Sequence, residues 1–310
     1  MTGVWLAALG RELGDHPCVV APLDAAHLNF EAQAVAARGL ARPVLRAASR
    51  RVARFEASHY AAFDRVLVLS GRDRDALLAI RRTLEVEVIP HAVDESAFLP
   101  PAIQHRERGR IIFHGVLSVA PNITAAEFLA REVMPLVRAA MPRANLAIVG
   151  RTPSRRVRAL GRLDGVRVIG EVRDIAAWLA GSHACAVPML TGAGVKNKLL
   201  EAMASGLPCV VTRLALGGMC ANPGRDLLVG EGADEFAAQL VRVLQNDKLA
   251  AALGAAARAY VMSQHSAAAV ATELTRIFDK VVAEHGHAHR SISQVCRESP
   301  PSTTRSMPVT

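Results

Sequence analysis

The sequence GAGVKNKLLEAMASG, residues Gly192–Gly206, decides the fold of this chain. An apolar run precedes it, HACAVPML over His183–Leu190, and another follows it, CVVT over Cys209–Thr212. Within it, apolar residues recur at helical spacing until Gly206 and Pro208 end the pattern. The segment therefore predicts a strand, a glycine turn, a helix and a second strand, which form one unit of a doubly wound parallel sheet.

The start of the expected helix suits an anion. A glycine turn leaves backbone N–H groups at a helix N-terminus, where they favour negative charge, and Lys196 and Lys198 add two cations. Glu201 follows Lys198 by three residues, so the two side chains lie on one helix face about 5 Å apart. This predicts a cation for a diphosphate and a carboxylate for a ribose. An ordinary exposed Lys–Glu pair is the alternative, and spacing alone leaves both open.

The longer segment PMLTGAGVKNKLLEAMASGLPCVVT, residues 188–212, resembles the donor site of family 4 retaining glycosyltransferases, which have the GT-B fold. The positions that match the family pattern are Lys198, Glu201, Ala202, Met203, Gly206 and Pro208. Lys196 stands where arginine is usual, and Ala193 stands where many relatives carry an earlier glutamate. The resemblance implies an α/β fold with two Rossmann-like, doubly wound parallel-sheet domains, the N-terminal one incomplete.

Alternating strand and helix patterns predict three regions. Residues 1–104 are expected to form a partial acceptor-side domain, residues 105–284 a donor-binding domain, and residues 285–310 a disordered tail. A full first domain needs about six βα units of about 30 residues each, so we expect a truncated reading frame rather than a reduced family member. The strands expected in the first region are Cys18–Asp24, Asp64–Ser70 and Val86–Pro90.

The second region repeats strand and helix through most of its length. Besides the opening segment, its expected strands are Arg110–Val116, Asn145–Gly150, Val166–Gly170 and Asp226–Val229. Its expected helices include Ile123–Ala140, Ala233–Gln245, Asp247–Met262 and Ser266–Glu284.

Composition points to an anionic partner. Lys and Arg exceed Asp and Glu by 37 − 28 = 9, and the isoelectric point is near 10.0. Aromatic residues are scarce and no nucleic-acid motif is present, which favours a nucleotide or an anionic lipid over nucleic acid. The five cysteines show no CxxC spacing, and Cys185 and Cys209 are expected to be core thiols in a reducing, cytoplasmic setting.

A basic helix suggests a membrane surface. Phe30–Phe63 reads as a long helical stretch with a break near Pro43, and its arginines repeat every four residues at Arg42, Arg46, Arg50 and Arg54. Such a stripe is suited to peripheral contact with an anionic inner membrane. A solvated helix face is the alternative.

The resemblance also implies the residues of the site. Those expected to bind the donor are Gly115, Val172, Gly192, Gly194, Lys196, Lys198, Glu201 and Gly218. Those expected to take part in catalysis are Lys198, Glu201 and Asp24. Asn122 and Asp174 are each expected to cap a helix.

The function implied is transfer of a sugar, of the hexosyltransferase type, from a nucleotide-diphosphate-sugar to a glycan or lipid-linked acceptor with retention, as in polysaccharide biosynthesis. No metal or other cofactor is expected, because Lys196 and Lys198 would offset the charge on the leaving diphosphate. The alternative is a truncated, non-catalytic module that binds nucleotide-sugars. A sugar-nucleotide epimerase lacks identifiable acid–base residues here, and a dehydrogenase lacks its GxGxxG turn.

Overall fold

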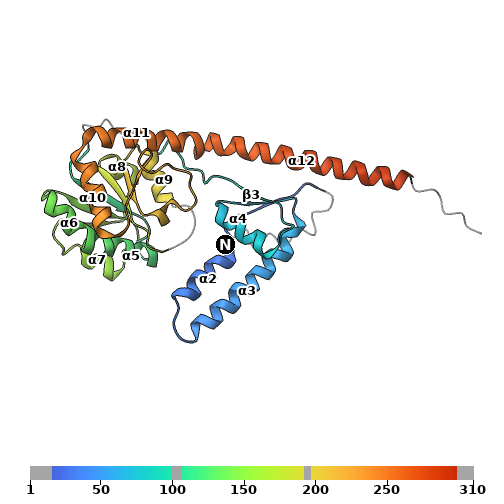
Figure 1. Cartoon of the computed structure of the whole chain (residues 1–310), viewed down its shortest axis with the longest axis horizontal. Coiled ribbons are helices and arrows are strands. Elements are labelled where there is room, and N and C mark those ends of the chain that lie inside the picture. Colours follow the sequence, from blue (N-terminus) through green and yellow to red (C-terminus); the bar gives the residue numbers. More distant parts are fainter. Residues whose placement is uncertain (1–15, 99–105, 192–196, 299–310) are drawn as a thin grey trace, which may run out of the picture.

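A computed structural model describes residues 16–98, 106–191 and 197–298. Two parallel sheets with helices packed against them form two lobes, and a long helix crosses from one lobe to the other (Figure 1). The expected α/β architecture with Rossmann-like parallel sheets is confirmed.

The first sheet has the strand order β1-β2-β3, and all three strands run parallel. They are β1 (Val19–Leu23), β2 (Arg65–Val68) and β3 (Val86–Val88), within the stretches expected from sequence. The helices of this lobe are α2 (Ala26–Ala36), α3 (Ala41–His59), the short 3-10 helix η2 (Tyr60–Ala62) and α4 (Gly71–Ile80). Ser70 caps α4 by accepting a hydrogen bond from the Asp73 N–H.

The helical break expected near Pro43 was wrongly placed. The chain leaves helical conformation between Ala36 and Ala41, and Pro43 lies in the first turn of α3. The first turn of a helix has no partner for its N–H groups, so a proline there costs no hydrogen bond. Gly39, with φ +60°, forms part of the connection.

The second sheet has the order β6-β5-β4-β7-β8-β9, again all parallel. Its strands are β4 (Arg110–His114), β5 (Asn145–Val149), β6 (Val166–Gly170), β7 (Ala184–Val187), β8 (Cys209–Val211) and β9 (Leu228–Val229). The order reverses between β4 and β7. In a doubly wound sheet this reversal opens a crevice at the carboxyl ends of the strands, where ligands bind.

Helices cover both faces of this sheet (Figure 1). They are α5 (Ala120–Phe128), the π-helical turn η4 (Leu129–Val133), α6 (Met134–Ala140), α7 (Arg155–Leu160), α8 (Ile175–Ala180), α9 (Asn197–Ala204), the 3-10 helix η5 (Arg213–Leu216), α10 (Gly232–Gln245) and α11 (Asp247–Gln264). Asp174 caps α8 as expected, because its Oδ1 accepts the Ala177 N–H at 3.0 Å.

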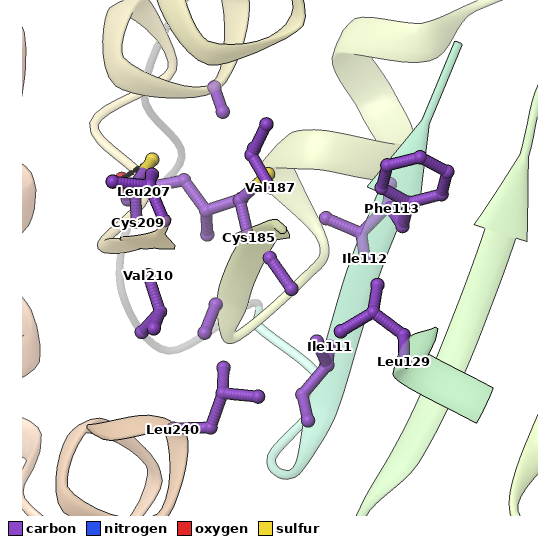
Figure 2. Packing of buried hydrophobic residues seen from close by; sticks show 14 of the residues in the cluster. Ile111, Ile112, Phe113, Leu129, Cys185, Val187, Leu207, Cys209, Val210 and Leu240 are labelled. Carbon is purple, nitrogen blue, oxygen red and sulfur yellow. Dashed lines mark hydrogen bonds between the residues drawn. The ribbon is translucent and has the colours of Figure 1, made fainter. Parts of the chain in front are cut away.

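The central strands of this sheet are buried on both faces. Figure 2 shows Ile111, Ile112 and Phe113 of β4 beside Cys185 of β7, with Leu240 of α10 approaching from one side. Cys185 and Cys209 are fully buried, in register on neighbouring strands, as expected for core thiols. A continuous apolar core of this kind fixes the strand ends that form the crevice.

Helix α12 (Ala267–Glu298) joins the two lobes. We expected residues 285–310 to be disordered, but the helix continues through Glu298, and residues 299–310 lie outside the described part. No proline interrupts the chain between Ala267 and Pro300, so the helical hydrogen bonds continue. None of the described helices is long and apolar enough to cross a membrane.

Candidate functional site

A cleft of about 660 Å³ opens at the carboxyl ends of β4, β5 and β6. This is the topological switch point of the second sheet, next to the amino-terminal half of α9. The residues that line it are His114, Gly115, Val116, Asn122, Val149, Gly150, Arg151, Glu171, Val172, Ile175, Asn197, Lys198 and Glu201.

Two glycines bring backbone to the floor of the cleft. Gly115 and Gly150 follow β4 and β5, and both have φ +148°. A Cβ at Gly150 would lie 1.8 Å from the Gly115 carbonyl oxygen, and one at Gly115 would lie 3.0 Å from Lys198 Nζ. Only glycine permits both contacts, so a ligand here meets bare backbone beside a lysine.

Lys198 is fixed in the cleft by two neighbours. Its Nζ donates to Asn122 Oδ1 at 2.5 Å and lies 4.6 Å from the centre of the Phe113 ring. Asn122 in turn donates from Nδ2 to the Val116 carbonyl at 2.9 Å. The ammonium group is therefore held at the edge of the cleft.

The expected capping role of Asn122 was wrong. Helix α5 begins at Ala120, its N-cap is Val119, and no side chain caps it. Pro121 removes one of the N–H groups that a cap would have satisfied. Asn122 instead turns toward the loop after β4 and holds Lys198.

Glu201 is held by a buried histidine that the sequence analysis did not single out. His114, the last residue of β4, is 4% exposed, and its Nε2 lies 2.8 Å from Glu201 Oε2. Among the described residues, His114 Nδ1 is buried without a hydrogen-bond partner. Burial lowers the pKa of His114, but its neighbours Cys185 and Glu201 outweigh that effect, and the net pKa is raised. The contact with His114 therefore fixes the orientation of the Glu201 carboxyl group.

The first lobe carries a histidine whose pKa is affected by carboxylates of both lobes. His91 follows β3, and burial lowers its pKa, while the carboxylates of Glu201 and Asp24 oppose that shift. Asp24 follows β1, next to Leu23, whose φ of +70° is unusual for a residue other than glycine. His91 therefore lies within electrostatic range of one carboxylate from each lobe.

The turn around His91 forms without backbone strain at Ala92. Among the described residues other than glycine, positive φ occurs only at Leu23 and Thr152. The Val93 N–H donates to the His265 carbonyl at 2.9 Å, and His265 Nδ1 lies 2.9 Å from the His91 carbonyl. Contacts to His265, in the connection between α11 and α12, hold this turn.

The structure brings together only some of the expected site residues. Gly115, Val172, Lys198 and Glu201 all line the cleft, and the last two are part-buried and have described partners rather than being an exposed pair. Asp24 belongs to the first lobe and is not among the residues that line the cleft, although its carboxylate acts on the pKa of His91. Gly192, Gly194 and Lys196 lie outside the described residues.

Gly218 is placed elsewhere. It does not line the cleft, and a Cβ at this position would lie 3.5 Å from Ser70 Cβ in the first lobe. Its φ of +94° explains the glycine as a turn residue. The structure therefore places it at the contact between the lobes.

Sequence reasoning missed His91, His114 and Gly150, although a signal was available. Each ends a strand or follows one at its carboxyl end, and the carboxyl ends of parallel strands meet at one edge of a sheet. Among the described residues, no group of three or more His, Cys, Asp or Glu side chains is arranged to hold a metal ion.

A known family profile matches the part of the chain that forms this cleft. Residues 108–246 match a family profile described as "Glycosyl transferases group 1", a segment that contains β4 to α10 and every residue lining the cleft. The match indicates a glycosyltransferase domain in this part of the chain. No curated protein matches the sequence.

Solved structures show the same fold over most of the chain. Sucrose-phosphate synthase from Thermosynechococcus elongatus is 18% identical with a TM-score of 0.70, covering 91% of this chain and 72% of its own. Anabaena HepE in complex with UDP-glucose is 14% identical with a TM-score of 0.65, covering 89% and 76%. A Rickettsia africae glycosyltransferase is 13% identical with a TM-score of 0.61, covering 91% and 94%. These GT-B neighbours establish the architecture of both lobes.

Proposed function

We propose that this chain is a retaining glycosyltransferase that takes a sugar from a nucleoside-diphosphate-sugar. The observation that carries the proposal is the cleft itself, where Lys198 and Glu201 are each held by a second side chain at the switch point of the donor sheet. The family match over residues 108–246 supports the reaction class. The UDP and UDP-glucose complexes of HepE support a nucleotide-sugar donor.

In this proposal Lys198 stabilises the leaving diphosphate. Charge builds on that group as the glycosidic bond breaks, and a fixed ammonium stabilises it without reorganisation. Asn122 and the Phe113 ring keep Nζ in place before the donor arrives. Gly115 and Gly150 let the diphosphate approach the backbone, where a side chain would exclude it.

Glu201 accepts hydrogen bonds from the ribose hydroxyls. Its partner His114 keeps the carboxyl group oriented, because His114 Nε2 lies 2.8 Å from Glu201 Oε2. The acceptor, a glycan or a lipid-linked glycan, enters from the first lobe beside Asp24 and His91. No metal ion or other cofactor is part of the proposal, and Lys196 is expected to share the charge of the diphosphate. A cytoplasmic location remains a prediction.

A panel of sugar nucleotides tests the proposal directly. Transfer and donor hydrolysis are measured with wild type and Lys198→Ala, and donor binding is measured by calorimetry. We expect about 10²- to 10³-fold loss of kcat in the variant with much smaller loss of donor affinity. Early products examined by proton NMR report whether the anomeric configuration is retained. Donor binding without transfer or hydrolysis in wild type would instead select the non-catalytic binding module.

A further inference from the structure

Helices α2 and α3 form an antiparallel hairpin that projects from the first lobe on the side opposite α12 (Figure 1). Its tip is the connection between Ala36 and Ala41. The tip exposes three large apolar side chains: Val35 is 79% exposed, Leu40 87% and Val44 67%. These are the three most exposed large hydrophobic residues in the described part of the chain. Exposing large apolar side chains to water is unfavourable, so their concentration at the tip indicates a binding surface.

Arginines follow this apolar tip along α3 toward the base of the hairpin. The exposed arginines of the connection and α3 are Arg38, Arg42, Arg46, Arg50, Arg51 and Arg54. Within the described residues, none of them forms an ion pair with a carboxylate. The four spaced by four residues extend over about 18 Å along the helix, since each residue rises about 1.5 Å. Their positive charge is therefore available to an external anionic surface.

The hairpin is anchored firmly at its base, so the exposure of the tip is not the result of frayed helices. The buried Glu56 of α3 accepts the Ala26 N–H at 2.6 Å and contacts His27 Nδ1 at 2.5 Å. Midway along α3, the hydroxyl of Ser49 donates to the His27 carbonyl at 3.1 Å. Two buried carboxylates, Glu56 and Asp73, thus fix the start of α2 directly after Asp24.

We propose that the hairpin tip inserts Val35, Leu40 and Val44 into an anionic phospholipid bilayer while the arginines bind the lipid headgroups. An apolar edge flanked by cations is the arrangement of helices that lie in a membrane interface. Three side chains are too few for a stable protein interface, which needs an area of about 1,000 Å² or more. The hairpin also lacks exposed aromatic residues on which nucleic-acid bases would stack.

The position of the hairpin base relates the proposed membrane contact to the rest of the first lobe. Asp24 lies at the end of β1 close before α2, and its carboxylate, like that of Glu201, raises the pKa of His91 against the effect of burial. An inserted tip would bring the first lobe, with Asp24 at the base of the hairpin, close to the bilayer. An acceptor carried on a lipid would then reach that lobe without leaving the membrane. The membrane contact itself does not depend on the proposed transferase activity.

Vesicle binding by the full chain separates the charged and apolar contributions. Sedimentation is measured with pure phosphatidylcholine vesicles and with vesicles containing phosphatidylglycerol, at low and high salt. We expect binding only to the anionic vesicles and weakening at high salt. The triple variant Arg42→Gln, Arg46→Gln, Arg50→Gln is expected to bind about 100-fold more weakly, at about fivefold per lost arginine. Leu40→Gln with Val44→Gln, which keeps every charge, is expected to lose about tenfold or more.

Insertion is tested separately with a tryptophan reporter. Leu40→Trp is expected to be quenched by brominated lipid, whereas Leu136→Trp, an exposed position on α6 in the other lobe, is not. Circular dichroism and thermal unfolding verify that each variant is folded. Equal binding to neutral and anionic vesicles, or binding unaffected by the arginine changes, would overturn the proposal. Salt-sensitive binding to heparin and vesicles without quenching of Trp at position 40 would reject insertion and indicate a general polyanion surface.

Discussion

At the scale of single residues, the cleft depends on pairs in which one side chain fixes another. Lys198 is held by Asn122, and Glu201 is held by His114. A free lysine or glutamate on a helix surface would lose side-chain entropy on binding a ligand, about 1.5–2 kcal/mol for each. Holding both groups before the donor arrives removes much of that cost.

His114 should give the protein a measurable pH dependence. Its pKa is raised above the ordinary 6.5, so folding favours the protonated ring. The stabilisation is fully present below about pH 6.5 and is lost as pH rises through the raised pKa. We therefore expect the difference in free energy of unfolding between wild type and His114→Gln to shrink from pH 6 to pH 8. Urea denaturation at both pH values measures it.

Three other histidines also have shifted pKa values, so the contribution of His114 must be measured as a difference between wild type and the variant. Burial lowers the pKa of His91, His183 and His265, so their contribution is lost as pH falls, the opposite sign. They are present in both proteins and cancel in the difference. A difference that is constant or grows with pH would contradict the assigned state of His114.

Gly150 should tolerate no side chain. Gly150→Ala places Cβ 1.8 Å from the Gly115 carbonyl oxygen, so the loops after β4 and β5 must separate. We expect a loss of about 2–4 kcal/mol in the free energy of unfolding and a loss of donor affinity, from overpacking added to an unfavourable φ. Thermal unfolding and calorimetry report the two effects.

Gly224→Ala is the matched control. Gly224 also has positive φ, at +86°, but nothing lies within 4 Å of the point that a Cβ would occupy there. We expect a loss of about 1–2 kcal/mol in the free energy of unfolding, from the backbone conformation alone, and unchanged donor affinity. Similar losses in both variants would mean that the close approach of Gly115 and Gly150 is not what restricts the site.

At the scale of elements, the base of the α2–α3 hairpin depends on one buried carboxylate. Glu56→Ala leaves the Ala26 N–H and His27 Nδ1 without their partner inside the lobe. Removing one member of such a pair typically costs about 3–5 kcal/mol. We expect urea unfolding to show that loss, whereas Glu31→Ala, an exposed acid on α2, should change stability by less than about 0.5 kcal/mol. Equal effects of the two variants would show that the buried pair does not anchor the hairpin.

The helices and strands were largely predictable from local sequence patterns, whereas the contacts between side chains far apart in the chain were not. Val66, Leu67 and Val68 read as a strand because β-branched and apolar residues run together between turn signals. The residues around Lys198 and Glu201 predicted a site at this end of the sheet, and both side chains line the cleft there, whereas nucleotide binding stays a prediction. The contacts of Asn122 and His114 were not predictable, because they join residues separated by 76 and 87 positions in the chain. The break before α3 was misplaced because Pro43 suits a first helical turn as well as an interruption.

At the scale of the whole molecule, the first lobe depends on a helix from the far end of the chain. In β2, Val66 and Val68 pack in a cluster with residues of its own lobe, such as Leu77. Leu67 points to the opposite face, since side chains alternate along a strand. There it joins Ile89 and, from α12, Ile277 and Val281. One face of this small sheet is therefore covered by α12.

Ile277→Ala should loosen the first lobe selectively. Ile277 is fully buried between α12 and the sheet, so its truncation leaves a cavity, which typically costs about 2–4 kcal/mol. We expect amide hydrogen exchange to accelerate in β2 and β3, while β4 and β5, whose core does not include α12, remain protected. Phe278→Ala, a neighbouring position that is 46% exposed, should leave both sheets protected. Acceleration of equal size in both sheets would instead mean that the two lobes unfold as one cooperative unit, joined through contacts such as that of Val93 with His265.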